Sequence, residues 1–204
     1  MNEVEVDRAC KGLIIDHPEV VYCGSLMSDE WLRLKPPREG KSISFAIINI
    51  LQRRDRLRMG HWITLLLDKS SIYYFDSYGL VPITYSSLLQ QCIDYYTTKG
   101  YEYVNCARRL QSATSLVCGA YTIMFAREFI RGGLKGILST FDRLFSKTNY
   151  DYNDRKVITY AYKNLRMPRC IRTFCRGAQT YARCIKTLCS DQEKKKKKKI
   201  VGGV

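Results

Sequence analysis

Short apolar runs in the first half of the chain predict β-strands, because strands span few residues and tolerate continuous burial. Residues 43–51 (ISFAIINIL), 61–67 (HWITLLL) and 72–75 (IYYF) are three such runs. Only Asp68-Lys69-Ser70-Ser71 separates the last two, so we expect them to pair as a β-hairpin. Residues 101–106 alternate enough to predict a fourth strand.

Apolar positions at helical spacing predict helices in the rest of the chain. Residues 84–98 indicate a helix with Thr84 as N-cap, and its apolar side comprises Leu88, Leu89, Cys92 and Tyr96. The run from Cys118 to Arg131 is the most apolar helix, and we expect Gly132-Gly133 to end it. A helix start at Ser28-Asp29-Glu30 and helices over 134–145 and 155–165 complete the set.

Together these elements predict a single α+β domain with a mixed, largely antiparallel sheet flanked by helices. The nucleophile candidate Cys118 would stand at the N-terminus of the central helix. We expect this domain to cover residues 1–168, ending at Pro168. Residues 169–204 are basic and rich in cysteine, and we interpret them as a separate C-terminal extension.

The net charge of the chain gives information about its binding partners. The 204 residues carry a formal net charge of +15, and the run Lys194–Lys199 supplies part of it. An excess that persists outside the lysine run favours a polyanionic partner, most plausibly nucleic acid, over simple solubility. The arginine-rich stretch at Arg53, Arg54, Arg56 and Arg58 indicates an exposed basic loop that contacts DNA.

Cysteine usage and hydropathy indicate the cellular compartment of the protein. Residues 1–7 are acidic and do not resemble a signal peptide, and no apolar run reaches membrane-spanning length. We therefore expect no membrane association, a reducing compartment and mostly free thiols. The extension carries the pattern C-x4-C-x8-C-x4-C without histidine, which is atypical for a zinc site; one apolar helix face is the alternative. That face would consist of Phe174, Tyr181, Ile185 and Leu188.

Cys118 is the first candidate for chemistry. A thiol at a helix N-terminus faces the positive end of the helix dipole and unpaired backbone N–H groups, which both favour thiolate. The alternative is a buried cysteine that only packs. A nucleophile also needs a base, and the two histidines are His17, in a polar segment, and His61, at the start of an apolar strand.

The hairpin supplies a geometric reason to choose His61. If Asp68 and Lys69 are the turn residues, His61 lies directly opposite Asp76 on the same face of the hairpin. Asp76 would then hold one ring nitrogen of His61, and the other nitrogen would face the thiol. The backbone N–H of Cys118 and the side-chain amide of Gln111 are candidate donors for an oxyanion hole.

Three motifs in this order resemble the adenovirus protease family (adenain), and also the SUMO-specific proteases and maturation proteases of large DNA viruses. They are GHW at 60–62, YFDSYG at 74–79 and QSATSLVCG at 111–119. The resemblance covers roughly residues 41–131, and the chain departs from adenain after about residue 134. Adenain has glutamate at the position of Asp76, whereas the SUMO proteases have aspartate.

The resemblance implies the adenain/SUMO-protease fold and a cysteine endopeptidase with His61 as general base, Asp76 as its orienting group, Cys118 as nucleophile and Gln111 as oxyanion donor. It also implies cleavage of viral precursor proteins after Gly-Gly or similar small-residue sites. A protease for ubiquitin or SUMO-like modifiers is the alternative with the same chemistry. A non-enzymatic basic DNA-binding or packaging protein is the alternative from another class.

The expected chemistry requires no metal or organic cofactor, but DNA or a basic peptide segment is a candidate activator. We expect a monomer located in the virion and the host nucleus or a cytoplasmic virus factory, not a secreted protein. The lysine run is compatible with both DNA binding and nuclear localisation. The C-terminal residues Ile200-Val201-Gly202-Gly203 resemble an adenain-type cleavage site, which predicts removal of Val204 by the enzyme itself.

Overall fold

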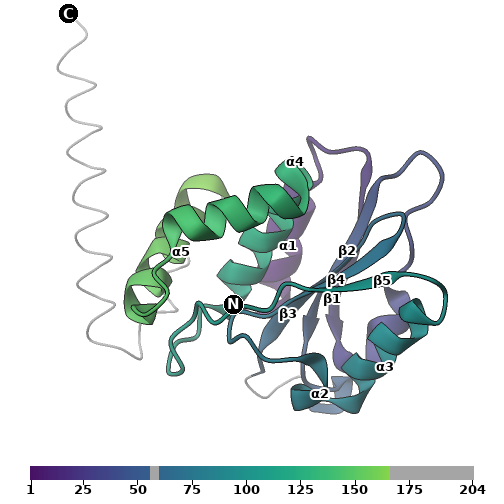
Figure 1. Ribbon diagram of the computed structural model, residues 1–204, viewed down its shortest axis with the longest axis horizontal. Helices are drawn as coiled ribbons and strands as arrows, with labels where there is room; N and C mark the ends of the chain where they lie inside the picture. The colour runs from purple at the N-terminus through teal and green to yellow at the C-terminus, as the bar shows by residue number, and fades with distance from the viewer. Residues whose placement is uncertain (56–59, 166–204) are drawn as a thin grey trace, which may run out of the picture. The chain divides into compact units, whose positions relative to one another are not determined.

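The computed structural model describes residues 1–55 and 60–165. In this part of the chain a five-stranded sheet lies between two groups of helices (Figure 1). The predicted boundary at residue 168 and the whole C-terminal extension lie outside the described residues, as do Arg56 and Arg58. No helix in the described ranges combines the length and hydrophobicity that crossing a bilayer would require.

The strands follow one another in the sheet in chain order. Their bounds are β1 (Val20–Met27), β2 (Ile43–Asn49), β3 (Trp62–Leu67), β4 (Ser71–Phe75) and β5 (Glu102–Asn105). The outer pairs β1–β2 and β4–β5 are parallel, and the inner pairs β2–β3 and β3–β4 are antiparallel. The sheet is therefore mixed, as expected, with its pairings divided equally between the two directions.

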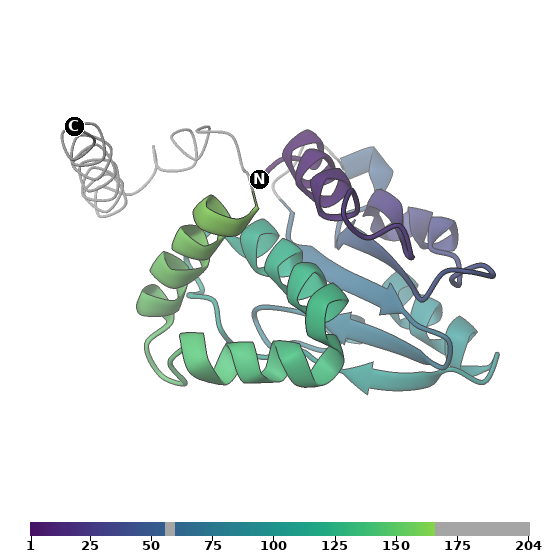
Figure 2. The ribbon, with the colours of Figure 1, turned by 90° about the horizontal axis from the view of Figure 1, so that it is seen from above.

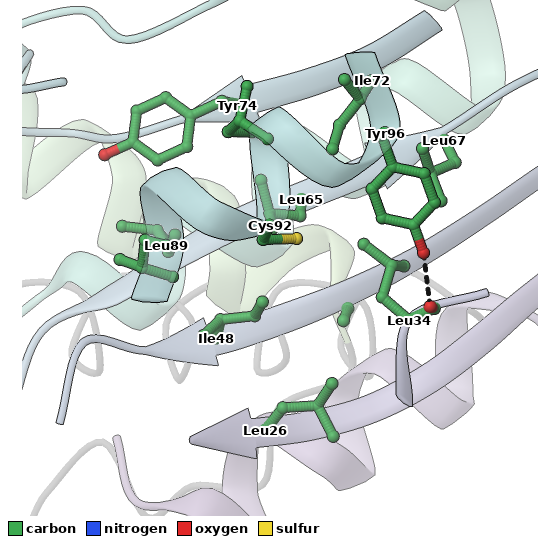
Figure 3. Packing of buried hydrophobic residues seen from close by; sticks show 13 residues of the cluster. Leu26, Leu34, Ile48, Leu65, Leu67, Ile72, Tyr74, Leu89, Cys92 and Tyr96 are labelled. Carbon is green, nitrogen blue, oxygen red and sulfur yellow. Dashed lines mark hydrogen bonds between the residues drawn. The ribbon is translucent and has the colours of Figure 1, made fainter. Parts of the chain in front are cut away.

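Both faces of the sheet are buried, which explains why the central strands are continuous apolar runs. On one face, alternate strand residues pack against the helix α3 (Ser87–Thr97) and the 3-10 helix η1 (Ser28–Arg33) (Figure 3). Tyr96 of α3 is fully enclosed there, and its hydroxyl donates to the Leu34 carbonyl oxygen at 2.6 Å. The hydroxyl group therefore keeps a partner inside an apolar cluster.

The opposite face packs against α4 (Cys118–Leu144), the helix that begins with the candidate nucleophile. Phe75 of β4 stacks on Phe125 of α4 with ring centroids 4.5 Å apart. Tyr73 meets Phe129 edge-on at 4.6 Å, one helical turn further along. These aromatic pairs fix α4 against the middle of the sheet, and with it the position of Cys118.

A glycine bends α4 where the sequence predicts an end. Gly133 has φ of +62°, so the helix is interrupted there and resumes in a new direction toward Leu144 (Figure 2). A side chain would disfavour this backbone conformation, whereas glycine tolerates it. Helix α5 (Tyr150–Asn164) then begins five residues before the predicted start at 155. Asn149 caps it, because its side chain accepts from the Tyr152 N–H.

Other element predictions require correction. The predicted helix 84–98 is two helices, α2 (Pro82–Tyr85) and α3, and Ser86 rather than Thr84 caps the second. Its hydroxyl accepts from the Leu88 N–H at 3.1 Å, and the extended backbone of Ser86 separates the two helices. Helix α1 (Glu3–Leu13) and the edge strand β1 were not predicted. Helix α1 has no continuous apolar run, whereas β1 opens with four apolar residues at 20–23, which were an available signal.

Candidate active site

His61 and Asp76 meet where two neighbouring strands end. His61 directly precedes β3 and Asp76 directly follows β4, and His61 Nε2 lies 2.5 Å from Asp76 Oδ1. Asp76 is fully buried and His61 is 6% exposed. The contact is therefore a short, charge-assisted hydrogen bond that water does not compete with.

The register that brings them together differs from the predicted one by two residues. Leu67 pairs with Ile72, not with Ser70, because the turn residues are Lys69 and Ser70. The Asp68 carboxylate stabilises this turn by accepting from the Ser70 and Ser71 amides at 2.8 and 2.7 Å. A shift of two residues leaves each side chain on the same face of a strand, so the predicted contact survives the wrong register.

Asp76 also accepts hydrogen bonds on the side away from His61. Its Oδ2 accepts from the Leu80 backbone N–H at 2.8 Å and from the Tyr85 hydroxyl at 3.0 Å. The Tyr78 N–H lies 3.2 Å from Oδ1. This set of donors holds the carboxylate in one orientation, which in turn fixes the plane of the His61 ring.

Two tyrosines that the sequence analysis did not single out enclose the His61 ring. Tyr78 stacks on it with centroids 4.5 Å apart, and the ring of Tyr85 lies at 5.4 Å. Tyr78 belongs to the YFDSYG motif, so its place in the motif was the available signal. For Tyr85, no local pattern indicated the contact.

Cys118 is the first residue of α4, and its thiol interacts with the His61 side chain. Burial alone would raise the pKa of the thiol. The hydrogen bond and positive charge of His61, with a further hydrogen bond from the Trp62 backbone, lower the pKa below its ordinary value. The start of a helix adds unpaired N–H groups beside the sulfur.

The pKa of His61 shifts in the opposite direction, upward. Burial alone would lower its pKa, but the hydrogen bonds to Asp76 and Cys118 and their negative charges raise the pKa to about 9. Both shifts favour the same state, a thiolate on Cys118 beside an imidazolium on His61. Such a pair can attack a carbonyl carbon and then deliver a proton to the leaving amine.

Gln111 lies in the same site, and its side-chain amide is 1% exposed. Its Nε2 donates to the Ser115 carbonyl oxygen at 2.9 Å and to the Tyr78 hydroxyl oxygen at 3.2 Å. Its Oε1 accepts from the Ser77 hydroxyl at 2.7 Å. The carbonyl acceptor at Ser115 determines which end of the amide is nitrogen, since a flipped amide would place two oxygens together.

The first residues of the chain cover the other side of the nucleophile. The Trp62 indole N–H donates to the Met1 carbonyl oxygen at 3.0 Å. Met1 also packs closely over Gly119, where an added Cβ would lie 2.9 Å from the Met1 sulfur. A capping box holds this segment, because the Glu5 N–H donates to the Asn2 side chain and the Asn2 N–H donates to the Glu5 carboxylate.

The remaining candidate residues lie away from this site. The His17 Nδ1–H donates to the Glu19 carboxylate, 3.1 Å away, so His17 is engaged outside this site. Arg53 binds the Glu30 carboxylate at 3.2 Å, and Arg54 lies 3.7 Å from Asp55. The five cysteines of the described part, Cys10, Cys23, Cys92, Cys106 and Cys118, are free thiols.

Within residues 1–55 and 60–165, no group of three or more His, Cys, Asp or Glu side chains is arranged to hold a metal ion. The four cysteines of the zinc-like pattern lie outside those residues.

Comparison with solved structures places this arrangement in a known fold. ChlaDub1 from Chlamydia trachomatis matches 80% of this chain and 89% of its own, with a TM-score of 0.53 at 12% identity. An ASFV protease matches 77% of this chain and 66% of its own, with a TM-score of 0.51 at 14% identity. The SUMO protease Ulp1 covers 79% of this chain at 16% identity with a TM-score of 0.47.

A scan of protein-family models finds no match to the chain, and neither does a search of curated protein sequences. The likeness to solved structures therefore concerns the fold. The chain has the adenain- and SUMO-protease-like α+β fold that its sequence motifs imply, with a mixed sheet and the cysteine at the start of the central helix.

Proposed function

We propose that the protein is a cysteine peptidase in which Cys118 is the nucleophile and His61 the general base and acid. The observation that carries the proposal is the buried chain of contacts from Asp76 to His61 to Cys118. A cysteine that only packs would not need an aligned imidazole or a buried carboxylate, each of which costs desolvation free energy.

In the proposed mechanism the Cys118 thiolate attacks the scissile carbonyl carbon and forms a tetrahedral oxyanion. The Cys118 N–H and one Gln111 N–H stabilise that oxyanion. Of the two Gln111 N–H groups, the one that donates to the Tyr78 hydroxyl oxygen, at the longer distance of 3.2 Å, is the one that would donate to the oxyanion instead. His61 then protonates the leaving amine, and water hydrolyses the thioester.

The decisive experiment compares the wild type with Cys118→Ala and His61→Ala on a peptide library with Gly-Gly before the scissile bond. We expect cleavage by the wild type and none by either variant. Full activity of His61→Ala would refute the assignment.

Mass spectrometry of iodoacetamide-treated protein at pH 6 provides a second test, since an activated Cys118 should react much faster than the other described cysteines.

We further propose that the substrates are precursor proteins cut after Gly-Gly or similar small residues, in the manner of a viral maturation protease. The support is the motif resemblance, the fold and the basic extension with its lysine run. A slot that excludes any Cβ would enforce glycine before the cut. Fusions that carry ubiquitin or a SUMO-like modifier ahead of a reporter are the discriminating substrates: preferential cleavage of the folded modifier would favour the modifier-protease alternative.

The same substrate rule extends to the chain's own C-terminus. We propose that the enzyme cleaves after Gly203, and that the preceding basic extension is a tethered activator or DNA-binding arm. Intact-mass measurement after long incubation should show loss of Val204 in the wild type and its retention in Cys118→Ala. Equal masses would refute self-processing and leave the protease assignment standing.

A further inference from the structure

Helix α5 reaches the segment that leads into the nucleophile through two consecutive buried polar residues. Asn153, fully buried, donates from Nδ2 to the Leu110 carbonyl oxygen at 3.1 Å. Asp154, 2% exposed, accepts from the Ser112 backbone N–H at 3.3 Å. The two contacts lie on either side of Gln111, the proposed oxyanion donor.

The second carboxylate oxygen of Asp154 binds a different element. The Tyr121 hydroxyl, on the first turn of α4, lies 3.0 Å from Asp154 Oδ1 and 3.2 Å from the Leu110 carbonyl oxygen. One carboxylate therefore connects the segment before the nucleophile to the helix that carries it. No other acidic side chain of α5 is buried, since Asp151 is exposed.

Holding a segment with a buried carboxylate costs desolvation free energy. Burial raises the pKa of Asp154 to about 6, even though hydrogen bonds from Tyr121 and Ser112 lower it. At neutral pH the group is thus a charge in a poorly hydrated place. Such groups concentrate at functional sites, where the geometry that they enforce compensates for their desolvation free energy.

The segment that Asp154 holds sets the geometry of the oxyanion side of the site. The Ser115 carbonyl oxygen accepts from Gln111 Nε2 at 2.9 Å and from the Tyr78 hydroxyl at 3.2 Å. Tyr78 in turn stacks on His61. A displacement of residues 112–115 would therefore move the Gln111 amide, whereas the bond between His61 and Asp76 is formed at the ends of β3 and β4.

We propose that Asp154 is a positioning residue of the peptidase, which fixes residues 112–115 against α4 and so keeps the Gln111 amide aimed at the oxyanion. The proposal rests on the proposed function for its catalytic meaning. It separates two parts of the site: the thiolate–imidazolium pair, which forms without Asp154, and the oxyanion hole, which requires it.

Two reactions of the same sulfur test this separation. Alkylation of Cys118 by iodoacetamide needs the thiolate but develops no oxyanion, whereas peptide hydrolysis needs both. In Asp154→Asn we expect kcat for a Gly-Gly peptide to fall about tenfold to a hundredfold, the order for weakening one oxyanion donor. KM and the alkylation rate at pH 6 should stay within about twofold of the wild type, since neither depends on the oxyanion hole.

Asp151→Asn is the matched control, because it removes one carboxylate from the same helix at an exposed position. It should change none of these quantities. An unchanged kcat in Asp154→Asn overturns the proposal. Equal losses of hydrolysis and alkylation also overturn it, because they would mean that the carboxylate supports the whole site.

If Asp154→Asn does not fold, Tyr121→Phe replaces it, since it removes the hydroxyl that joins Asp154 to α4 and leaves the Ser112 contact. The same split between hydrolysis and alkylation is expected, and its absence overturns the proposal. Amide hydrogen exchange gives a readout that needs no activity. Ser112 should exchange faster in Asp154→Asn than in Asp151→Asn, and equal exchange overturns the proposed anchoring even if the wild type cleaves no peptide.

Discussion

At the scale of single residues, Asp76 shows how much of the site depends on one acceptor. Its carboxylate accepts from His61, Leu80 and Tyr85. The bond to His61 fixes the ring orientation and stabilises the imidazolium. The charge of Asp76 and its geometry therefore act together.

Asp76→Asn keeps the volume but replaces one acceptor oxygen with an N–H₂ group. That group must face either the Leu80 and Tyr85 donors or the His61 nitrogen, and each choice breaks a hydrogen bond. We expect kcat to fall by about 10⁴-fold, the order seen when a triad aspartate becomes asparagine, with a small residual activity. Asp16→Asn, at an exposed position, is the control, and a loss of less than about tenfold would contradict an orienting role.

The pKa changes of Cys118 and His61 predict different pH profiles for two reactions. The pKa of the Cys118 thiol is lowered, so hydrolysis should rise with pH as the thiolate forms, at a pH below the usual range for cysteine. The pKa of His61 is raised to about 9, so hydrolysis should fall again near pH 9, when the proton for the leaving amine is lost.

Alkylation by iodoacetamide needs no such proton and should not fall at that pH. The measurement is kcat/KM beside the alkylation rate, both from pH 5 to pH 10. Parallel loss of both reactions near pH 9 would contradict the assignment of His61 as the proton donor.

At the scale of elements, the turn after β4 places Asp76 and Tyr78 together. Gly79 has φ of +77°, and an added Cβ would lie 2.7 Å from the Arg109 backbone nitrogen. Gly100 has a similar φ of +88°, but nothing lies within 4 Å of its added Cβ. The two positions therefore separate backbone strain from steric overlap.

Gly100→Ala should cost about 1 kcal/mol of the free energy of unfolding, from backbone strain alone. Gly79→Ala should cost about 2–4 kcal/mol, because overpacking against residues 108–109 adds to the strain. Urea denaturation measures both. Gly79→Ala should also lower kcat, since Asp76 and Tyr78 shift with the turn, and equal effects of the two substitutions would show that the close contact does not matter.

The capping box of α1 makes a second prediction at this scale, because it holds Met1 over Gly119 and Trp62. Glu5→Ala removes one half of the box. N-terminal caps are typically worth about 1 kcal/mol, so opening of the segment should become about fivefold more frequent. The alkylation rate of Cys118 should rise accordingly, whereas Glu3→Ala, in the same helical turn, should leave it unchanged.

At the scale of the whole molecule, the net charge of +15 favours binding to a polyanion, and DNA remains our proposal for it. Arg53 binds Glu30 at 3.2 Å and is 49% exposed, whereas Arg54 lies 3.7 Å from Asp55 and is 79% exposed, so Arg54 is the better candidate of these two. Counterion release makes such binding steeply dependent on salt.

Replacement of Arg54, Arg56 and Arg58 by alanine should reduce the slope of log affinity against log salt by about 2–3, close to one for each lost phosphate contact. Arg53→Ala should reduce the slope by less than one, because the Arg53 ion pair with Glu30 is shorter than that of Arg54 with Asp55. Fluorescence anisotropy with a labelled duplex measures the slope. No binding at low salt would refute a DNA partner.

The candidate site could be predicted from sequence to a large extent because its signals are local. Cys118 and its glycine start an apolar helix, and His61 and Asp76 flank a hairpin whose strands are plainly apolar. The predicted register was wrong, yet strand residues alternate with a period of two, so a shift of two residues kept both side chains on one face. The alternation therefore determined the pairing of His61 with Asp76 more reliably than the turn did.

Only the tertiary structure decided which distant segments meet this site. The following contacts join separate segments of the chain: the rings of Tyr78 and Tyr85 beside His61, Met1 over Gly119, and the bonds from Asp154 to Ser112 and Tyr121. None of these contacts follows from spacing or periodicity, because those patterns report only a residue's near neighbours. The sequence by itself determined the strands and the helix start that carry His61, Asp76 and Cys118, and packing determined which distant residues hold them in place.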